Sequence, residues 1–257
     1  MRLHLVTAAC AVALCSTPAA AQTSDLARSI VGLIGNAVAT SKQRKITAQL
    51  SAPLTYEEAA GPRDLANRND PRNLDIGGVR LGMSIVQAQS ALRAAGYTDR
   101  GPQNDQPSYI GNVMWKWQTE YDWKGNTNDR APRELAWFKG NEEIFVGLIA
   151  LPDGPRVEYV RYQAREEARI SKDDLLRRIL AKYGEPVNED ETELRWCTIK
   201  APDCEASPDN EFPLLTAWPG NGSIRLSGND PGLQAALEQR FKADVESRKP
   251  ADVAPSF

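Results

Sequence analysis

The order of the regular segments most constrains the fold: short strand-like stretches joined by tight turns, interrupted by single amphipathic helices. Three turn sequences each separate two such stretches, as in antiparallel hairpins: Lys139–Glu142, Leu151–Gly154 and Pro219–Gly222. Strands are predicted at Met114–Trp123, Glu134–Phe138, Ile144–Leu151, Arg156–Gln163, Glu193–Ile199, Leu214–Trp218 and Ser223–Leu226. This order predicts an α+β fold, with single helices packed on one face of an antiparallel sheet, rather than a doubly wound sheet.

Three helices carry start signals. Ser84 with Gln87 is a capping box, and Ser171 precedes a helix with acids in its first turn. Asp230 followed by proline begins the third. The first helix is expected to end at Gly96 and the second at Gly184. Their predicted apolar faces are Ile85, Ala88, Leu92 and Ala95; Leu175, Leu176, Ile179, Leu180 and Tyr183; and Leu233, Ala236, Leu237 and Phe241.

The first two helices belong to two similar strand–helix units. Leu74–Gly82 is predicted as a strand with a glycine break before the first helix, and Val157–Tyr162 as the strand before the second. Both units therefore follow the same order of strand, cap, amphipathic helix and glycine exit.

The motifs Gly82-Met-Ser84, Gly96-Tyr97 and Leu180–Pro186 resemble those of two known envelope groups. Small outer-membrane lipoproteins of the SmpA/OmlA group and the secreted β-lactamase inhibitory proteins use a G-M-[ST] helix start and a G-x-P exit. The resemblance covers residues 76–97 and 157–226 and implies helices on a small antiparallel sheet and non-enzymatic binding of other proteins. The chain departs from the lipoproteins in its length, its Trp-rich segment and its lack of a convincing lipobox.

The first 21 residues have the three parts of a signal peptide. A basic start is followed by the apolar run Leu5–Cys15 and by Ser16–Ala21, which ends in a small-x-small pattern, so cleavage is predicted before Gln22. The alternatives are a lipoprotein signal, disfavoured by the bulky Leu14 before Cys15, and a retained anchor, which needs about 20 apolar residues. The protein is therefore expected to be periplasmic or secreted.

The remainder divides into four expected segments. Residues 22–50 are an N-terminal helical arm, 51–73 a linker, 74–248 the α+β domain and 249–257 a flexible tail. Leu26, Ile30, Leu33 and Ala37 form an apolar stripe on the arm, which is the part expected to contact a membrane, if any does; packing on the domain is the alternative. Within the linker, Thr55 and Glu58 can cap one short helical turn.

Composition excludes several chemistries. The chain has one histidine, His4, which leaves with the leader, so His-based triads, His–Cys dyads and His metal sites are not expected. The sequence has no G-x-S-x-G, S-x-x-K or Walker motif and no dinucleotide fingerprint. With 31 basic and 34 acidic residues and a net charge of −3, no nucleic-acid partner is expected. Neither a cofactor nor a metal is predicted.

Two cysteines remain after the leader is removed. Cys197 and Cys204 flank a turn-forming Pro-Asp, and such a pair in an exported chain predicts a disulfide. A redox pair is the alternative, but C-x6-C differs from the C-x-x-C spacing that activates a thiol. Two cysteines are too few for a structural zinc site.

The candidate binding residues are the aromatic side chains Trp115, Trp117, Tyr121 and Trp123, which alternate along one predicted strand. Such a row can contact a protein or stack on sugars, although a half-buried sheet also places such a row in its core. Arg161 and Arg165 can pair with acids at the sheet edge.

We therefore expect an exported cell-envelope binding protein that acts by non-covalent contact with another envelope or secreted protein, or with a glycan. The alternative is a glycan-acting hydrolase that uses two carboxylates. The sequence does not single out a pair among Glu134, Glu142, Glu143, Glu158, Asp173 and Asp174. The acidic loop Asn188–Glu193 lacks the ligand order of an EF-hand, so no catalytic or metal residue is assigned.

Overall fold

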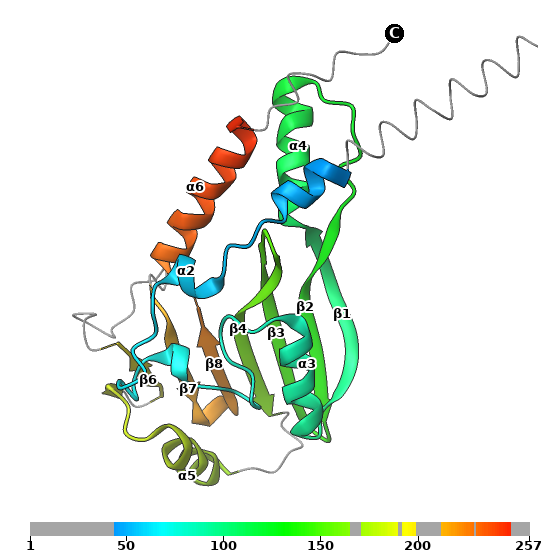
Figure 1. Ribbon diagram of the computed structural model, residues 1–257. Coiled ribbons are helices and arrows are strands. Elements are labelled where there is room, and N and C mark those ends of the chain that lie inside the picture. The colour runs from blue at the N-terminus through cyan, green and yellow to red at the C-terminus, as the bar shows by residue number, and fades with distance from the viewer. Residues whose placement is uncertain (1–43, 165–170, 190–191, 199–211, 229, 248–257) are drawn as a thin grey trace, which may run out of the picture. The chain divides into compact units, whose positions relative to one another are not determined.

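An eight-stranded antiparallel sheet forms the centre of the fold (Figure 1). The structure is a computed structural model that describes residues 44–164, 171–189, 192–198, 212–228 and 230–247. The chain divides into two units, Met1–Ile46 and Thr47–Phe257, and the fold given below is that of the second unit. Its sheet and helices confirm the predicted α+β class.

The strands follow the order β1-β2-β3-β4-β8-β7-β6-β5. Their bounds are β1 Thr98–Pro107, β2 Arg130–Lys139, β3 Glu142–Leu151, β4 Gly154–Ala164, β5 Asn188–Glu189, β6 Leu194–Cys197, β7 Leu214–Trp218 and β8 Ser223–Ser227. The α-helices are α2 Tyr56–Ala60, α3 Ile85–Ala94, α4 Tyr109–Tyr121, α5 Lys172–Tyr183 and α6 Pro231–Ser247, with short 3-10 turns η1 Pro71–Asn73 and η3 Pro219–Asn221.

The sheet consists of two similar halves that meet where β4 pairs with β8. In the first half α3 is followed by β1–β4, with α4 between β1 and β2, and in the second half α5 is followed by β5–β8. Within each half, consecutive strands pair antiparallel. The repeated unit is thus a helix followed by four strands. The predicted strand at Leu74–Gly82 is wrong, because the segment forms only a bridge between Ile76 and Val79.

The predicted helix starts are confirmed. Ser84 Oγ accepts a hydrogen bond from Gln87 N at 3.3 Å, and Gln87 Oε1 accepts one from Ser84 N at 2.9 Å. Ser171 caps α5 by accepting from the N–H of the third helical residue, and Asp230 accepts from two N–H groups in the first turn of α6. These local side-chain bonds fix where each helix begins.

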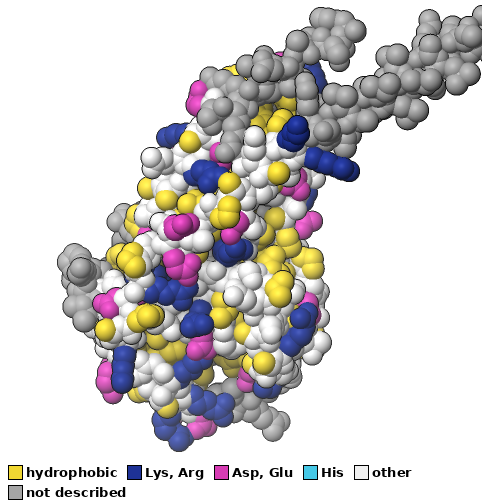
Figure 2. All heavy atoms as spheres, viewed as in Figure 1, with side chains coloured by type: hydrophobic (Ala, Val, Ile, Leu, Met, Phe, Trp, Pro, Cys, Tyr) yellow, Lys and Arg dark blue, Asp and Glu magenta, His cyan; other side chains and the backbone are white. Residues whose placement is uncertain are grey.

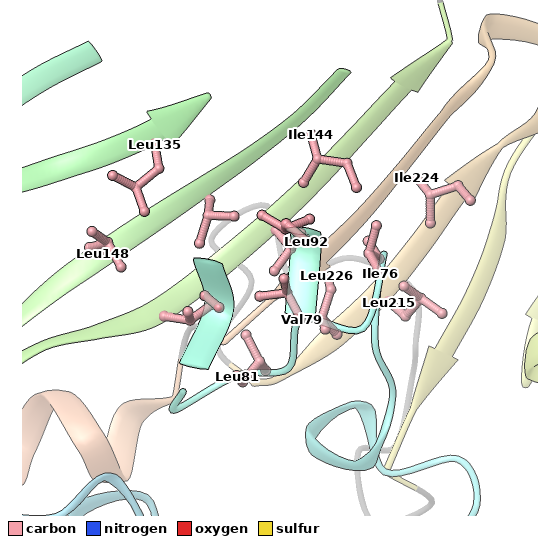
Figure 3. Packing of buried hydrophobic residues seen from close by; sticks show 14 of the residues in the cluster. Ile76, Val79, Leu81, Leu92, Leu135, Ile144, Leu148, Leu215, Ile224 and Leu226 are labelled. Atoms are coloured by element: carbon pink, nitrogen blue, oxygen red, sulfur yellow. The ribbon is translucent and has the colours of Figure 1, made fainter. Parts of the chain in front are cut away.

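The main core lies between one face of the sheet and the helices. A single row of apolar side chains crosses six strands in direct register: Leu135, Val146, Val160, Leu226, Leu215 and Trp196. All six are almost completely buried. Buried side chains of α2, α3, α5 and α6 belong to the same cluster. In Figure 3, Leu92 of α3 and the neighbouring Val79 and Leu81 lie among the strand residues of this cluster.

The segment expected as a linker contributes to this core. Thr55 and Glu58 form the predicted capping box, which turns residues 56–60 into α2, and Tyr56 is 2% exposed. Asp70, which is fully buried, accepts hydrogen bonds from the backbone and guanidinium of Arg72. Residues 51–73 are therefore part of the domain, and the linker prediction is wrong for this stretch.

Strand β1 was missed because its sequence has no strand signal. Thr98–Pro107 carries two prolines and a glycine among polar residues, which disfavour a strand within a sheet. It forms the edge of the sheet, where its register against β2 is interrupted three times, and most of its residues are exposed. Edge strands tolerate proline because their outer N–H groups need no partner strand.

Several predictions fall outside the described residues: the signal peptide 1–21, the apolar stripe of the arm from Leu26 to Ala37, Cys204 and the tail 249–257. Cys197 ends β6 and is 1% exposed, and its disulfide with Cys204 stays a prediction. Among the described helices, none has the length and apolar character needed to span a membrane.

Candidate functional site

The four candidate aromatic residues lie on and directly after a helix, so the predicted strand Met114–Trp123 is wrong. Residues Tyr109–Tyr121 form α4, and Ser108 Oγ caps it by accepting a hydrogen bond from Gly111 N at 2.9 Å. A short aromatic run can satisfy both the helical and the strand period, so its pattern does not decide between them. The helix ends at Tyr121, and the residue after it, Asp122, caps it in a left-handed conformation with φ of 53°.

The helix separates the side chains that a strand would have placed in one row. Trp117 and Trp123 are 0% and 6% exposed, whereas Trp115 is 56% and Tyr121 36% exposed. Residues two positions apart do not share a helix face. The rings of Trp117 and Trp123 meet edge to face with centroids 5.8 Å apart, which stabilises the fold. Of the four candidates, Trp115 is thus the one best placed to contact a partner.

The second face of the sheet offers a larger candidate surface. A second row of residues lies directly beside the apolar row, and its side chains point to the opposite side because strand side chains alternate. It is again in direct register across six strands and consists of Ala136, Phe145, Arg161, Arg225, Thr216 and Arg195. Arg161 and Arg225 are exposed at its middle, and Phe145 is half-buried. We call this side of the sheet the open face.

Arginine side chains lie over aromatic rings along the open face. The Arg161 guanidinium is 4.6 Å from the ring centroid of Phe145, Arg225 is 5.6 Å from that of Tyr159, and Arg100 is 5.1 Å from that of Phe138. Each cation is attracted to the electron-rich ring face, and this contact restricts the long arginine side chain. The open face therefore presents held guanidinium groups rather than freely moving ones.

The Tyr159 ring packs directly against Gly147 of the neighbouring strand, where the lack of a side chain leaves room for it. These two residues are register partners on β3 and β4, and a Cβ on Gly147 would lie 1.9 Å from ring carbon Cε1 of Tyr159. The Tyr159 hydroxyl donates a hydrogen bond to Glu134 Oε2. Burial and the neighbouring Glu134 carboxylate raise the pKa of Tyr159 to about 12.

The charges of the open face are unevenly paired. Arg100 forms an ion pair with Glu143 at 3.0 Å, and Arg195 forms one with Glu193 at 2.7 Å. Arg161 and Arg225 face each other as register partners, and neither forms an ion pair with an acid in the described parts of the chain. By contrast, Figure 2 shows Lys and Arg interspersed with Asp and Glu over the helix-bearing side.

Arg161 was expected at the sheet edge, and the structure places it at the centre, on β4 beside β8; Arg165 lies outside the described residues. Sequence reasoning missed Arg225, Phe145, Phe138 and Tyr159 as members of one surface. Alternation within each strand indicates which residues share a face, but pairing between β4 and β8 joins residues far apart in the chain. Local patterns contain no signal for such a pairing.

Most of the candidate carboxylates are engaged by neighbouring groups. Glu134 accepts a hydrogen bond from Tyr159, Glu142 Oε2 accepts one from Tyr97 at 2.8 Å, and Asp174 pairs with Arg177. Glu158 differs, because desolvation raises its pKa above the ordinary value of 4.5. No two of these carboxylates stand out as an acid and base pair, and no group of three or more metal-binding side chains occurs among the described residues.

Two hollows lie elsewhere on the domain. One of about 370 Å³ lies between the start of α4 and the β3–β4 turn and is lined by Ser108, Asp129 and Asp153. The other, about 210 Å³, lies between α5 and the sheet and is lined by Tyr97, Tyr162 and Tyr183. Their polar groups are largely engaged within the protein: Asp129 accepts from Ser108 Oγ, and the Tyr183 hydroxyl donates to Asp75 O.

The chain matches no known protein family, no curated protein sequence and no solved structure. The function of the open face is therefore inferred from the chemistry of its own side chains.

Proposed function

We propose that this protein is an exported binding protein of the cell envelope, which holds a protein partner non-covalently on the open face of its sheet. The observation that carries the proposal is the exposed pair Arg161 and Arg225 at the centre of this row, with the rings of Phe145, Tyr159 and Phe138 around it. Arginine and aromatic side chains are the types that contribute most to the free energy of protein–protein contacts.

The arrangement favours binding over catalysis. The rings of the open face are covered by guanidinium groups rather than left bare for a sugar to stack on. Tyr159 and Gly147 interlock, and two of the arginines are paired with glutamates, so the surface is preorganised. A surface whose side chains are already restricted loses less conformational entropy when a partner binds.

The experiment is a crosslinking pull-down from envelope fractions with the exported protein as bait. The test bait carries Phe138→Ala and Phe145→Ala, and the control bait carries Trp115→Ala, which removes the exposed tryptophan of α4. We expect a specific envelope protein with the unchanged and control baits, and at least about tenfold less with the test bait. Loss with Trp115→Ala alone would instead place the contact on α4.

The alternative is a glycan-acting hydrolase, for which the raised pKa of Glu158 is the favouring observation, since a general acid must hold its proton near neutral pH. Retention of the bait on peptidoglycan or polysaccharide, without a specific protein, would favour this function over ours. The Glu158→Gln variant would then abolish glycan cleavage, whereas Glu134→Gln or Glu143→Gln would identify the second carboxylate.

A further inference from the structure

The two exposed arginines meet at the junction between the halves of the sheet. Arg161 on β4 and Arg225 on β8 are direct register partners, and these two strands are where the first four strands join the second four. Side chains at directly opposed positions of an antiparallel pair lie close together, within about 5 Å at Cβ. The two arginine side chains thus start from neighbouring positions on an exposed surface, with Arg161 over the Phe145 ring and Arg225 over the Tyr159 ring.

Like charges in this position disfavour the folded state, because directly opposed charges of one sign repel each other. Among the described residues, no carboxylate forms an ion pair with either arginine. Glu134 accepts a hydrogen bond from Tyr159, and Glu143 is paired with Arg100. Glu158 interacts with Arg225 through space only, and the net effect of its surroundings is to raise its pKa. The arrangement is unfavourable in the free protein, and an anion bound between the guanidinium groups would relieve it.

We propose that Arg161 and Arg225 together bind a side-chain carboxylate in an acidic segment of the protein partner. This inference rests on the proposed function and specifies the chemistry of the partner. A planar guanidinium can donate two parallel hydrogen bonds to a carboxylate. The Phe145 ring lies under the Arg161 guanidinium and the Tyr159 ring under that of Arg225, so each arginine is supported by a ring of the sheet.

The charges of the domain favour a short acidic peptide segment over an extended polyanion. The chain has a net charge of −3, and the open face also carries Glu134, bonded to Tyr159, and Glu143, paired with Arg100. A nucleic acid or an anionic membrane needs a broad basic surface. Two guanidinium groups with aromatic rings beside them match a single carboxylate whose neighbouring side chains are apolar.

The first test uses poly-L-glutamate as the probe, titrated into the exported protein at low ionic strength. The double variant Arg161→Gln/Arg225→Gln is the test, and Arg93→Gln is the matched control, because Arg93 is also an exposed arginine over a ring, 5.4 Å from the Trp137 centroid. We expect binding to fall at least about tenfold in the double variant and to stay unchanged in the control. Equal binding by all three proteins, or none by the unchanged protein, would overturn the inference.

A second measurement reports on the pair without any ligand. Because Arg161 and Arg225 repel each other, replacing either with glutamine should raise the thermal midpoint at low salt, and the gain should shrink as salt screens the repulsion. An unchanged midpoint at low salt would contradict the repulsion. Inorganic pyrophosphate serves as a second probe: binding tighter than poly-L-glutamate, and lost in the double variant, would assign the pair to a phosphate group and overturn the carboxylate.

The outcomes separate this inference from the proposed function. If the envelope partner is lost with Phe138→Ala/Phe145→Ala but kept with Arg161→Gln/Arg225→Gln, the open face binds a protein and the carboxylate inference fails. If poly-L-glutamate binds through the two arginines while the pull-down recovers no protein, the anion site exists and the protein partner does not.

Discussion

The indole Nε1 of Trp117 donates a hydrogen bond to the backbone carbonyl oxygen of Val245, with 3.0 Å between the two atoms. This bond joins α4 to the last part of α6, and both residues are buried. A tryptophan that reads from the sequence as a binding residue therefore connects two helices of the domain.

Replacing Trp117 with alanine should destabilise the fold by about 3–5 kcal/mol, because it removes a fully buried ring and leaves the carbonyl of Val245 without its donor. Trp115→Ala, two positions away and 56% exposed, should change stability by less than about 0.5 kcal/mol. Urea unfolding of the two variants measures the difference. Similar stability losses in both would contradict the helical assignment of this segment.

A neighbouring contact gives a smaller, separable effect. The Tyr109 hydroxyl donates to Asp244 Oδ2 at 2.8 Å, and Asp244, which is 3% exposed, also accepts from Arg240 Nε at 2.7 Å. Tyr109→Phe should cost about 1–2 kcal/mol, because a buried charged acceptor loses one donor. Tyr121→Phe removes a similar bond to Glu246 at the surface and should cost less than about 0.5 kcal/mol. Denaturation curves in which Tyr121→Phe costs as much as Tyr109→Phe would refute this ranking.

The sequence predicted those parts of the fold whose signals are local. The caps at Ser84, Ser171 and Asp230 place three helices, because a side chain bonding to its own first turn is specified by neighbouring residues. The hairpin turns likewise place β2, β3, β7 and β8 to within a few residues. The start of α4 at Ser108 was missed, since no glutamate or glutamine follows at the third helical position.

The candidate surface depended on a contact that local patterns cannot specify. The alternation of Val157–Tyr162 puts Arg161 opposite the core side, but only the pairing of β4 with β8 brings Arg225 beside it. These residues belong to different halves of the sheet, and the choice of partner strand depends on how the whole core packs. The sequence therefore predicted the faces of single strands and missed the row that crosses them.

The Gly147–Tyr159 contact predicts a penalty for adding one methyl group. Gly147→Ala would push against the Tyr159 ring and disturb its bond to Glu134, so we expect a loss of about 1–3 kcal/mol. Gly220→Ala is the control, because a Cβ there meets nothing within 4 Å. In a double-mutant cycle, Tyr159→Ala should absorb most of the Gly147→Ala penalty. Additive losses would show that Tyr159 does not fill the space above Gly147.

The ionisation of Glu158 should make the stability of the protein depend on pH. Desolvation raises its pKa above 4.5, so the folded state binds the proton more tightly than the unfolded state. Its unfavourable contribution is then fully present above the raised pKa and disappears as the pH falls below 4.5. Glu158→Gln should therefore stabilise the protein at pH 7 and have little effect near pH 4, as measured by urea unfolding at each pH.

Glu58 serves as a control, because its effect on stability should change with pH in the opposite direction to that of Glu158. Hydrogen bonds from Thr55 lower its pKa, so its favourable contribution is present above 4.5 and is lost as the pH falls through the lowered pKa. Glu58→Ala should destabilise the protein at neutral pH and lose its effect in acid. A Glu158→Gln effect that follows the same trend as Glu58→Ala would rule out desolvation as the main influence on Glu158.

The predicted disulfide between Cys197 and Cys204 can be checked by mass. Thiol alkylation of the protein without reduction should leave its intact mass unchanged, and alkylation after reduction should add two groups. Cys204→Ser should lower the free energy of unfolding by about 2–3 kcal/mol, because the bond closes a short loop and restricts the unfolded chain. Cys197 is 1% exposed, so alkylation is carried out in denaturant, which makes both thiols accessible. Two groups added before reduction would show that the cysteines are unpaired.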